Sequence, residues 1–250
     1  MKFLEKYITY FKIHFAKAFI FCVSFVLFYS GLSIADGAVI DKIYHPYVQP
    51  LEREIEFRAL MQDNQPGYDD RVQLYRLAYG QSINEHWFGE IYIIGEQSAH
   101  DDFNIEAYEL ETLWQITEQG EFAVDWGMLF EIEKEAHKDI WEFSVGLLAE
   151  KEWGKWSSTA NVFITEEWGS DIDSELETSL GLQARYRYSK ALEPALEFYS
   201  GEDTRALGPA LLGQIALDGK RQIKWEAGVI FGLDEKSPNQ TLRLLAEFEF

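Results

Sequence analysis

Apolar and polar residues alternate at almost every second position through most of this chain. The clearest example is residues 122–132, in which Phe122, Trp126 and Phe130 fall on one face and Asp125 and Glu131 on the other. A period of two is typical of β-strands whose two faces meet different surroundings. Because a helix needs a period near 3.6 residues, this pattern constrains the chain to an all-β fold.

The alternating segments form an even set of strands of similar length. We predict strands over residues 51–62, 71–82, 87–98, 103–117, 121–135, 141–153, 156–168, 176–189, 191–201, 207–218, 221–234 and 241–250. Even numbers of antiparallel strands of about ten residues are typical of closed transmembrane barrels, in which closure satisfies every backbone group. We therefore predict a closed, antiparallel, up-and-down transmembrane β-barrel of about 12 strands over residues 51–250.

The strand over 71–82 is the least regular of the set. Val72 and Leu74 are out of phase with Leu77 and Tyr79. An extra residue inserted into one strand of a pair reverses the phase in this way. The pattern therefore indicates either a β-bulge in this strand or an error in the register assigned to it.

Composition excludes two classes of protein. The chain has 43 Asp and Glu against 22 Lys and Arg, and aromatic residues make up 16% of it. Nucleic-acid binding requires a basic surface, so we expect no nucleic-acid partner. Disordered acidic chains are poor in aromatic residues, so a folded chain is expected.

The N-terminus has the pattern of an export signal. Lys2, Lys6, Lys12 and Lys17 precede an uncharged apolar run over 18–34, and residues 33–35 read Ser-Ile-Ala. This order is typical of a signal peptide, here residues 1–35 with cleavage after Ala35. An uncleaved anchor is the alternative, because the run approaches the roughly 17 residues that span a bilayer. Both interpretations imply that the rest of the chain is exported.

Residues 36–50 precede the first predicted strand. Pro46 and Pro50 argue against a regular element there. We expect either a short periplasmic N-terminal tail or a partial plug around residues 44–47 (Tyr-His-Pro-Tyr).

Aromatic placement favours a membrane barrel over a soluble sandwich. If odd strands run outward, Trp87, Trp114 and Trp225 fall at one end of the barrel, and Trp141 and Trp168 fall at the other. Two aromatic girdles of this kind mark the two membrane interfaces. The less apolar strand faces also carry many charges, which a wet lumen accommodates more readily than a dry core.

The final residues alternate up to the last position. Leu242, Leu244, Ala246, Phe248 and Phe250 lie two residues apart. This ending resembles the C-terminal recognition signature of outer-membrane barrel proteins. Over residues 48–250 the chain resembles small outer-membrane β-barrel proteins of proteobacteria. The resemblance implies location in the outer membrane of a Gram-negative bacterium, contact with its lipid and lipopolysaccharide, and assembly by the barrel-assembly machinery through Phe250.

The charged inward positions suggest a function for the lumen. The candidates for lining it are Arg58, Glu96, Glu109, Glu111, Asp125, Glu131, Glu133, Glu142, Arg185, Arg187, Lys224, Glu226, Arg243 and Glu247. Carboxylate rings favour cations, so these residues predict a narrow diffusion channel with an acidic outer mouth, for small cationic or polar solutes. Channels for acidic sugars, which occur among similar barrels, would be expected to line the pore with arginine tracks, whereas this set has more carboxylates than arginines.

The alternative is a closed barrel with a structural or envelope-maintenance role, in which the same charges form ion pairs. Small inward residues such as Gly127 and Gly181 favour a channel, whereas inward bulk such as Leu129, Leu148 and Tyr199 favours closure. The sequence leaves these two hypotheses open.

Metal binding and catalysis receive weaker support. Asp171, Asp173 and Glu175 alternate in a loop and are candidates for a divalent cation, but they lack the full calcium-loop pattern. Nothing resembles a catalytic triad or nucleophile elbow. We therefore expect no catalytic residue and no cofactor, and a lipid-active enzyme is a distant third hypothesis.

Overall fold

The computed structural model describes residues 39–63, 71–98 and 101–250. The predicted signal peptide over 1–35 lies outside these residues, as do positions 36–38 of the predicted tail. Within the described ranges, no helix has the length and hydrophobicity needed to cross a membrane.

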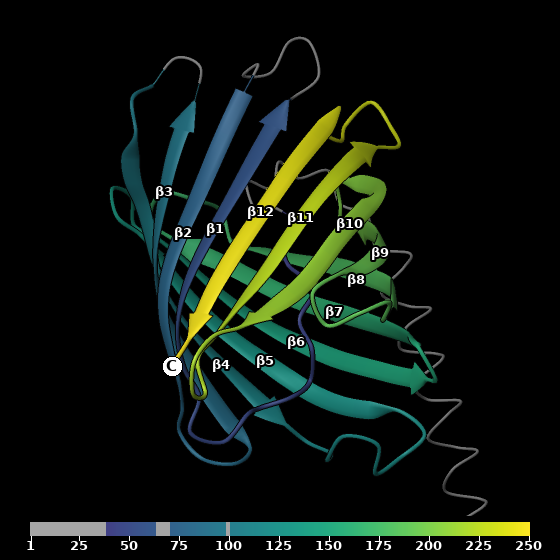
Figure 1. The fold of residues 1–250 in the computed structure, drawn as a ribbon. Coiled ribbons are helices and arrows are strands. Elements are labelled where there is room, and N and C mark those ends of the chain that lie inside the picture. Colours follow the sequence, from purple (N-terminus) through teal and green to yellow (C-terminus); the bar gives the residue numbers. More distant parts are fainter. Residues whose placement is uncertain (1–38, 64–70, 99–100) are drawn as a thin grey trace, which may run out of the picture. The chain divides into compact units, whose positions relative to one another are not determined.

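The described residues form a closed antiparallel barrel of twelve strands (Figure 1). Each strand pairs with its neighbours in sequence, and β12 pairs with β1 to close the barrel. The strands are β1 Arg53–Asp63, β2 Arg71–Ser82, β3 Trp87–Ser98, β4 Asn104–Gln115, β5 Asp125–Glu135, β6 Ile140–Trp153, β7 Trp156–Gly169, β8 Glu175–Tyr186, β9 Glu193–Ser200, β10 Arg205–Ala216, β11 Gln222–Gly232 and β12 Gln240–Glu249. The predicted fold is confirmed.

We name the two ends of the barrel by the chain that lies there. The terminal end is where β1 begins at Arg53 and β12 finishes at Glu249, and the loop end is the opposite one. Odd-numbered strands therefore run from the terminal end to the loop end, and even-numbered strands run back.

Two details of the predicted strands are wrong. β2 keeps one continuous register with β1 and with β3, and the irregular pairing lies instead between β3 and β4, at Ile94/Gly95. Alternation in β2 simply places Val72 and Leu74 inward near the loop end. Phe122 precedes β5, which begins at Asp125, and its side chain is exposed in the turn.

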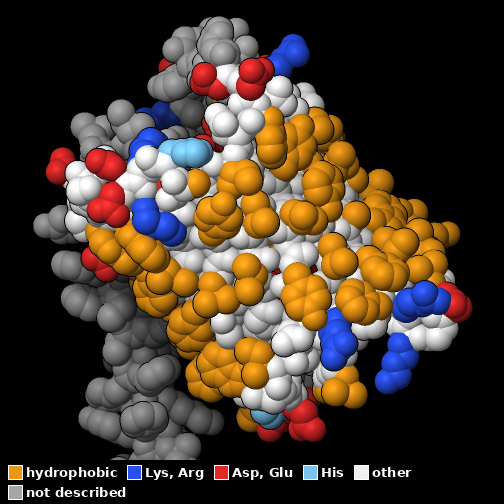
Figure 2. Space-filling model, turned by 90° about the vertical axis from the view of Figure 1, so that its left-hand side faces the viewer, with side chains coloured by type: hydrophobic (Ala, Val, Ile, Leu, Met, Phe, Trp, Pro, Cys, Tyr) orange, Lys and Arg blue, Asp and Glu red, His pale blue; other side chains and the backbone are white. Residues whose placement is uncertain are grey.

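The outer wall is apolar, and aromatic residues lie near its ends. Figure 2 shows one face on which hydrophobic side chains cover the middle and charged side chains gather at the borders. Trp87 and Trp114 stack across β3 and β4 with ring centroids 5.4 Å apart. Trp141 lies opposite Trp168 at the other end of the barrel. The alternation thus turns its apolar side outward, as the membrane interpretation requires.

The interior is occupied by the chain that precedes β1. We call residues 39–50 the lumen strap (dark purple in Figure 1). Tyr44 and Val48 pack in one buried cluster with inward residues of β3 to β6, among them Leu129. Ile40 and Ile43 pack in a second cluster with Tyr199, Ala206 and Ile230. Of the two alternatives left by the sequence, these contacts correspond to the plug.

Two inward glycines leave room for the strap rather than for an open pore. A Cβ atom at Gly127 would lie 2.9 Å from the Pro46 side chain, and one at Gly181 would lie 2.7 Å from Ile43. At Gly127 such a contact would displace the Pro46 ring, and at Gly181 it would displace at least the end of the Ile43 side chain. The small residues that favoured a channel on sequence grounds therefore fit the closely packed strap.

Candidate functional site

Two fully buried arginines hold the start of the lumen strap. The Arg58 guanidinium donates to the Asp41 carboxylate at 2.5 Å and to Glu56 at 2.6 Å. Arg243 donates to the Asp41 carbonyl at 2.5 Å and to Glu197 at 2.8 Å. Both side chains are 0% exposed, so their charges depend on these partners, and losing a partner would leave a buried charge uncompensated.

The strap's aromatic residues and histidine bind carboxylates of the wall. The Tyr44 hydroxyl donates to Glu111 at 2.7 Å, and the Tyr47 hydroxyl donates to Asp125 at 2.9 Å. His45 Nδ1 lies 2.6 Å from Glu150. Asn161 exchanges two hydrogen bonds with the Tyr44 backbone, and Gln115 accepts one from the Val48 amide. The strap is thus bound along its length by side chains of β4 to β7.

Adjacent strap residues Asp41 and Lys42 carry opposite charges inside the barrel. Burial acts to raise the pKa of Asp41, but the guanidinium groups of Arg58 and Arg76 hold it below its ordinary value. Burial acts to lower the pKa of Lys42, but Glu56, 2.7 Å away, and Glu90 raise it well above the ordinary value. Both groups are therefore ionised at neutral pH.

Inward glutamates line up in two neighbouring rows that cross the strands. Pairing places Glu249 opposite Glu54, and Glu90 opposite Glu111, which itself lies opposite Glu131. The first row, in order around the wall, consists of Glu249, Glu54, Glu90, Glu111 and Glu131. The second consists of Glu247, Glu56, Glu109, Glu133, Glu142, Glu167 and Glu175.

The second acidic row climbs from one end of the barrel to the other, whereas the first ends at Glu131, in the middle of β5. Both rows begin beside Glu249 at the terminal end, and the second finishes at Glu175, the first residue of β8 at the loop end. A row follows the hydrogen-bond direction, which is inclined to the barrel axis because the strands are tilted. Like charges directly opposite each other destabilise a sheet, so the rows carry a cost in stability.

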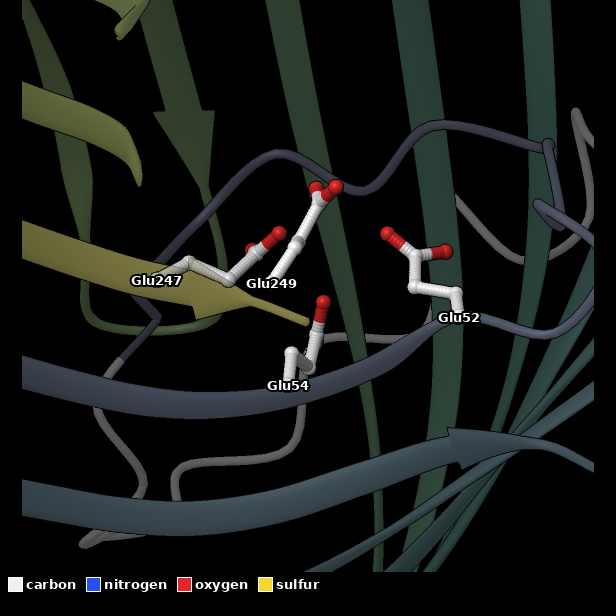
Figure 3. A group of neighbouring side chains, drawn as sticks. All are labelled: Glu52, Glu54, Glu247 and Glu249. Atoms are coloured by element: carbon white, nitrogen blue, oxygen red, sulfur yellow. The ribbon is translucent and has the colours of Figure 1, made fainter. Parts of the chain in front are cut away.

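Carboxylates of the rows gather into a compact group near the terminal end. In the terminal group, Glu52, Glu54, Glu247 and Glu249 point toward one another, with oxygens within 4.8 Å (Figure 3). The Lys224 ammonium lies 2.7 Å from Glu247 and 3.3 Å from Glu52, and it also contacts Glu249. Burial, with Glu249 adding to it, raises the pKa of Glu52 to about 7 despite Lys224.

A second group lies along the interior of β4 and β5. In the mid-lumen group, Glu109, Glu111 and Glu131 have oxygens within 4.8 Å of one another. Arg76 donates to Glu109 at 2.8 Å, and Tyr44 of the strap donates to Glu111.

The sequence-predicted lining residues lie where alternation placed them, with one exception. Arg58, Glu109, Glu111, Asp125, Arg243 and Glu247 are buried, and Glu96, Glu131, Glu133, Glu142, Arg185, Lys224 and Glu226 are partly buried. Arg187 lies just past the end of β8, where it contacts Glu152. Residues that the prediction missed include Lys42, Arg76, Glu90 and Glu150. The alternation within their strands would have assigned Arg76, Glu90 and Glu150 to the inward face. Lys42 could not be found in this way, because it lies in the strap and not in a strand.

The loop candidates for a metal lie apart from these groups. Asp171 accepts a hydrogen bond from the Asp139 amide at 2.7 Å, which joins two loops of the loop end. Asp173 is exposed, and Glu175 is the last member of the second acidic row. Among the described residues, the groups with ligand oxygens within 4.8 Å of one another are the terminal and mid-lumen groups.

Comparisons with known proteins find the fold but no family. No protein-family model matches the chain, and no curated protein matches its sequence. The structure is similar to the COG4313 outer membrane channel from Pseudomonas putida F1, with a TM-score of 0.54 and 13% identity, over 82% of this chain and 98% of that one. It is also similar to the KdgM porin, solved alone and in complex with disordered oligogalacturonate. Both KdgM comparisons have a TM-score of 0.50 and cover 79% of this chain. The identity is 11% over 99% of the structure solved alone, and 10% over 98% of the structure of the complex. At these identities the likeness concerns the fold alone: this chain is a closed twelve-stranded barrel whose fold is similar to that of an outer membrane channel and of a porin.

Proposed function

We propose that the protein is a narrow, cation-preferring channel of the outer membrane of a Gram-negative bacterium. The observation that carries this proposal is the pair of acidic rows on the inner wall, the second of which runs from the terminal end to the loop end. A wall lined by one sign of charge concentrates counter-ions, and carboxylate rings select cations. Small cationic or polar solutes are the proposed substrates.

Location in the membrane is supported by the outer wall. An apolar band suits the lipid interior, and aromatic side chains suit the two membrane interfaces. The wall has such a band, with the aromatic pairs Trp87–Trp114 at the terminal end and Trp141–Trp168 at the loop end. Contact with lipopolysaccharide through divalent ions at the loop end, and recognition of Phe250 by the assembly machinery, remain proposals of the same kind.

The loop end forms the acidic mouth of the proposed channel. Glu133, Glu142, Glu167 and Glu175 follow one another across β5 to β8 near this end. Their proximity in one row gives entering cations a continuous series of carboxylates. Arg58 and Arg243, by contrast, are neutralised by their own buried partners and add little field to the path.

A second candidate function is the closed structural barrel, and the lumen strap favours it. The strap is bound by ion pairs and hydrogen bonds to several strands, and it packs closely against Gly127 and Gly181. As a channel, the barrel would conduct around the strap and therefore with low conductance.

Planar-bilayer recording distinguishes the two functions. Protein purified from membranes in detergent is expected to give small discrete steps, and a reversal potential in a KCl gradient that indicates K⁺ preference. Silence from protein that is folded, as judged by heat-modifiable migration on gels, would favour the closed barrel. The lipid-active enzyme, which we do not propose, can be checked on the same sample with a phospholipid-hydrolysis assay.

The acidic mouth has its own test. Glu133→Gln with Glu142→Gln is expected to reduce the K⁺/Cl⁻ permeability ratio severalfold, because two carboxylates leave the row. The matched control is Glu166→Gln, which removes a carboxylate from the outward face of β7 at the same end. If both variants retain the wild-type ratio, the mouth does not set selectivity.

A further inference from the structure

The mid-lumen group differs from an ordinary cluster of acidic side chains in how its members are fixed. Glu109 and Glu111 are consecutive inward residues of β4, and Glu131 faces Glu111 across the β4–β5 pairing. Their oxygens lie within 4.8 Å of one another. Two ligands on opposite sides of a Ca²⁺ ion would lie about 4.8 Å apart, because Ca–O distances are roughly 2.4 Å. The three carboxylates are therefore close enough together for an oxygen of each to reach one calcium ion.

Buried carboxylate oxygens here lack hydrogen-bond donors. Glu109 is 5% exposed and Glu90, which pairs with Glu111, is 3% exposed. Arg76 donates to Oε2 of Glu109, but no donor among the residues that the structure describes reaches Oε1 of Glu109 or Oε1 of Glu90. Buried polar atoms are nearly always bonded, so an unpartnered oxygen inside a carboxylate group indicates a missing cationic or donor ligand.

The charge balance indicates a cation rather than a neutral donor. Lys42 is bonded to Glu56 at 2.7 Å and reaches Glu90 only at 4.0 Å. In the terminal group, by contrast, the Lys224 ammonium contacts Glu52, Glu247 and Glu249 directly. Buried charges need compensation, and within the described residues the ion pair that the mid-lumen group makes is the one between Arg76 and Glu109, while the Tyr44 hydroxyl that contacts Glu111 carries no charge.

We propose that Glu109, Glu111 and Glu131 bind a divalent cation of the calcium class beneath the lumen strap. Carboxylate oxygens are hard ligands that suit Ca²⁺ and Mg²⁺, and Ca²⁺ tolerates irregular geometry and completes its shell with water. The Tyr44 hydroxyl, 2.7 Å from Glu111 and 3.5 Å from Glu131, is positioned to add a strap oxygen to this shell. The site does not depend on the proposed channel function.

The test is calcium binding to the purified full-length protein. After dialysis against EDTA, isothermal titration with CaCl₂ is expected to show one saturable site per barrel. Glu131→Gln is expected to lower its affinity at least tenfold, because Gln retains the shape but loses the charge. Glu109→Gln is the second variant, used if Glu131→Gln fails the heat-modifiability check of folding.

Two matched variants exclude other origins of binding. Glu226→Gln removes an inward carboxylate outside both acidic rows, and it should leave calcium affinity unchanged. Asp173→Asn removes an exposed carboxylate at the loop end and should also leave it unchanged. The proposal is overturned if no saturable calcium binding occurs, or if the affinity is unchanged in both Glu131→Gln and Glu109→Gln; a loss confined to Asp173→Asn would place the ion at the loop end instead. Binding without conductance would retain the site and reject the channel, and cation-selective conductance without binding would do the reverse.

Discussion

The terminal and mid-lumen groups contain the same side chains but differ in their counter-charge. Lys224 lies opposite Glu247 in the β11–β12 pairing, so its ammonium reaches the terminal group from the adjacent strand. At the corresponding places beside the mid-lumen group, the pairing supplies more carboxylates, Glu90 and Glu133. The difference shows that register, rather than composition, decides whether a buried glutamate is neutralised by the protein or left to an external cation.

Removing Lys224 should give the largest effect, because it takes away the counter-charge that distinguishes the terminal group from the mid-lumen group. Lys224→Met would leave Glu52, Glu247 and Glu249 without their shared cation. We expect a loss of roughly 2 kcal/mol in the free energy of unfolding, below the full cost of breaking a buried ion pair because Lys224 is about one-third exposed. Urea titration in lipid vesicles measures this change. Arg221→Met, in an exposed turn, is the control, and an equal effect in both would show that the terminal group does not need its lysine.

Calcium tests the mid-lumen group, where the counter-charge is proposed to be an external cation. A ligand present at tenfold its Kd stabilises the folded state by about 1.4 kcal/mol. Wild type and Lys224→Met should both gain this stability from CaCl₂, whereas Glu131→Gln should gain little. Urea midpoints with CaCl₂ and with EDTA give the answer. A gain kept in Glu131→Gln and enlarged in Lys224→Met would assign the ion to the terminal group instead, because Lys224 competes there for the carboxylates.

The pH dependence gives the smallest expected effect. Burial raises the pKa of Glu52 from its ordinary 4.5 to about 7, so between these values the folded barrel holds a proton that the unfolded chain releases. Stability should therefore fall as pH rises from about 5 to about 8, by about 1 kcal/mol because Glu52 is partly solvated. Glu52→Gln should flatten this slope, as measured by urea midpoints across the range. An unchanged slope would mean that another group titrates.

Local alternation was enough to predict the strands and their inward faces. Phe122–Ile132 and Leu242–Phe250 each carry the period of two that turns one face outward and the other to the lumen. The start of β5 was misplaced because Phe122 continues the alternation into a turn that no ladder hydrogen bond supports. The phase of Val72 and Leu74 in β2 was misinterpreted because inward residues near the loop end, such as Leu74, are themselves apolar.

The rows and the strap required long-range information. Glu109, Glu131 and Glu142 were each assigned inward from their own strands, but their alignment depends on pairing between strands. No single strand specifies that register, and a shift of two residues would preserve every inward face while separating the carboxylates. The position of Tyr44 beside Glu111 depends in turn on curvature that brings β4 and the strap together.

The closing seam between β1 and β12 has a consequence for the order of assembly. Glu54 pairs with Glu249 and Glu56 with Glu247, so two positions near opposite ends of the described chain must meet before the barrel is complete. Contacts of such sequence separation form late, because the intervening chain must first be ordered. The partners of the strap, among them Glu111, Glu150 and Tyr199, come together only when the sheet has curled. Insertion of the strap and joining of the seam therefore belong to the same final stage, and a nascent barrel still open at β1 and β12 would present both an unfilled interior and two unpaired strand edges.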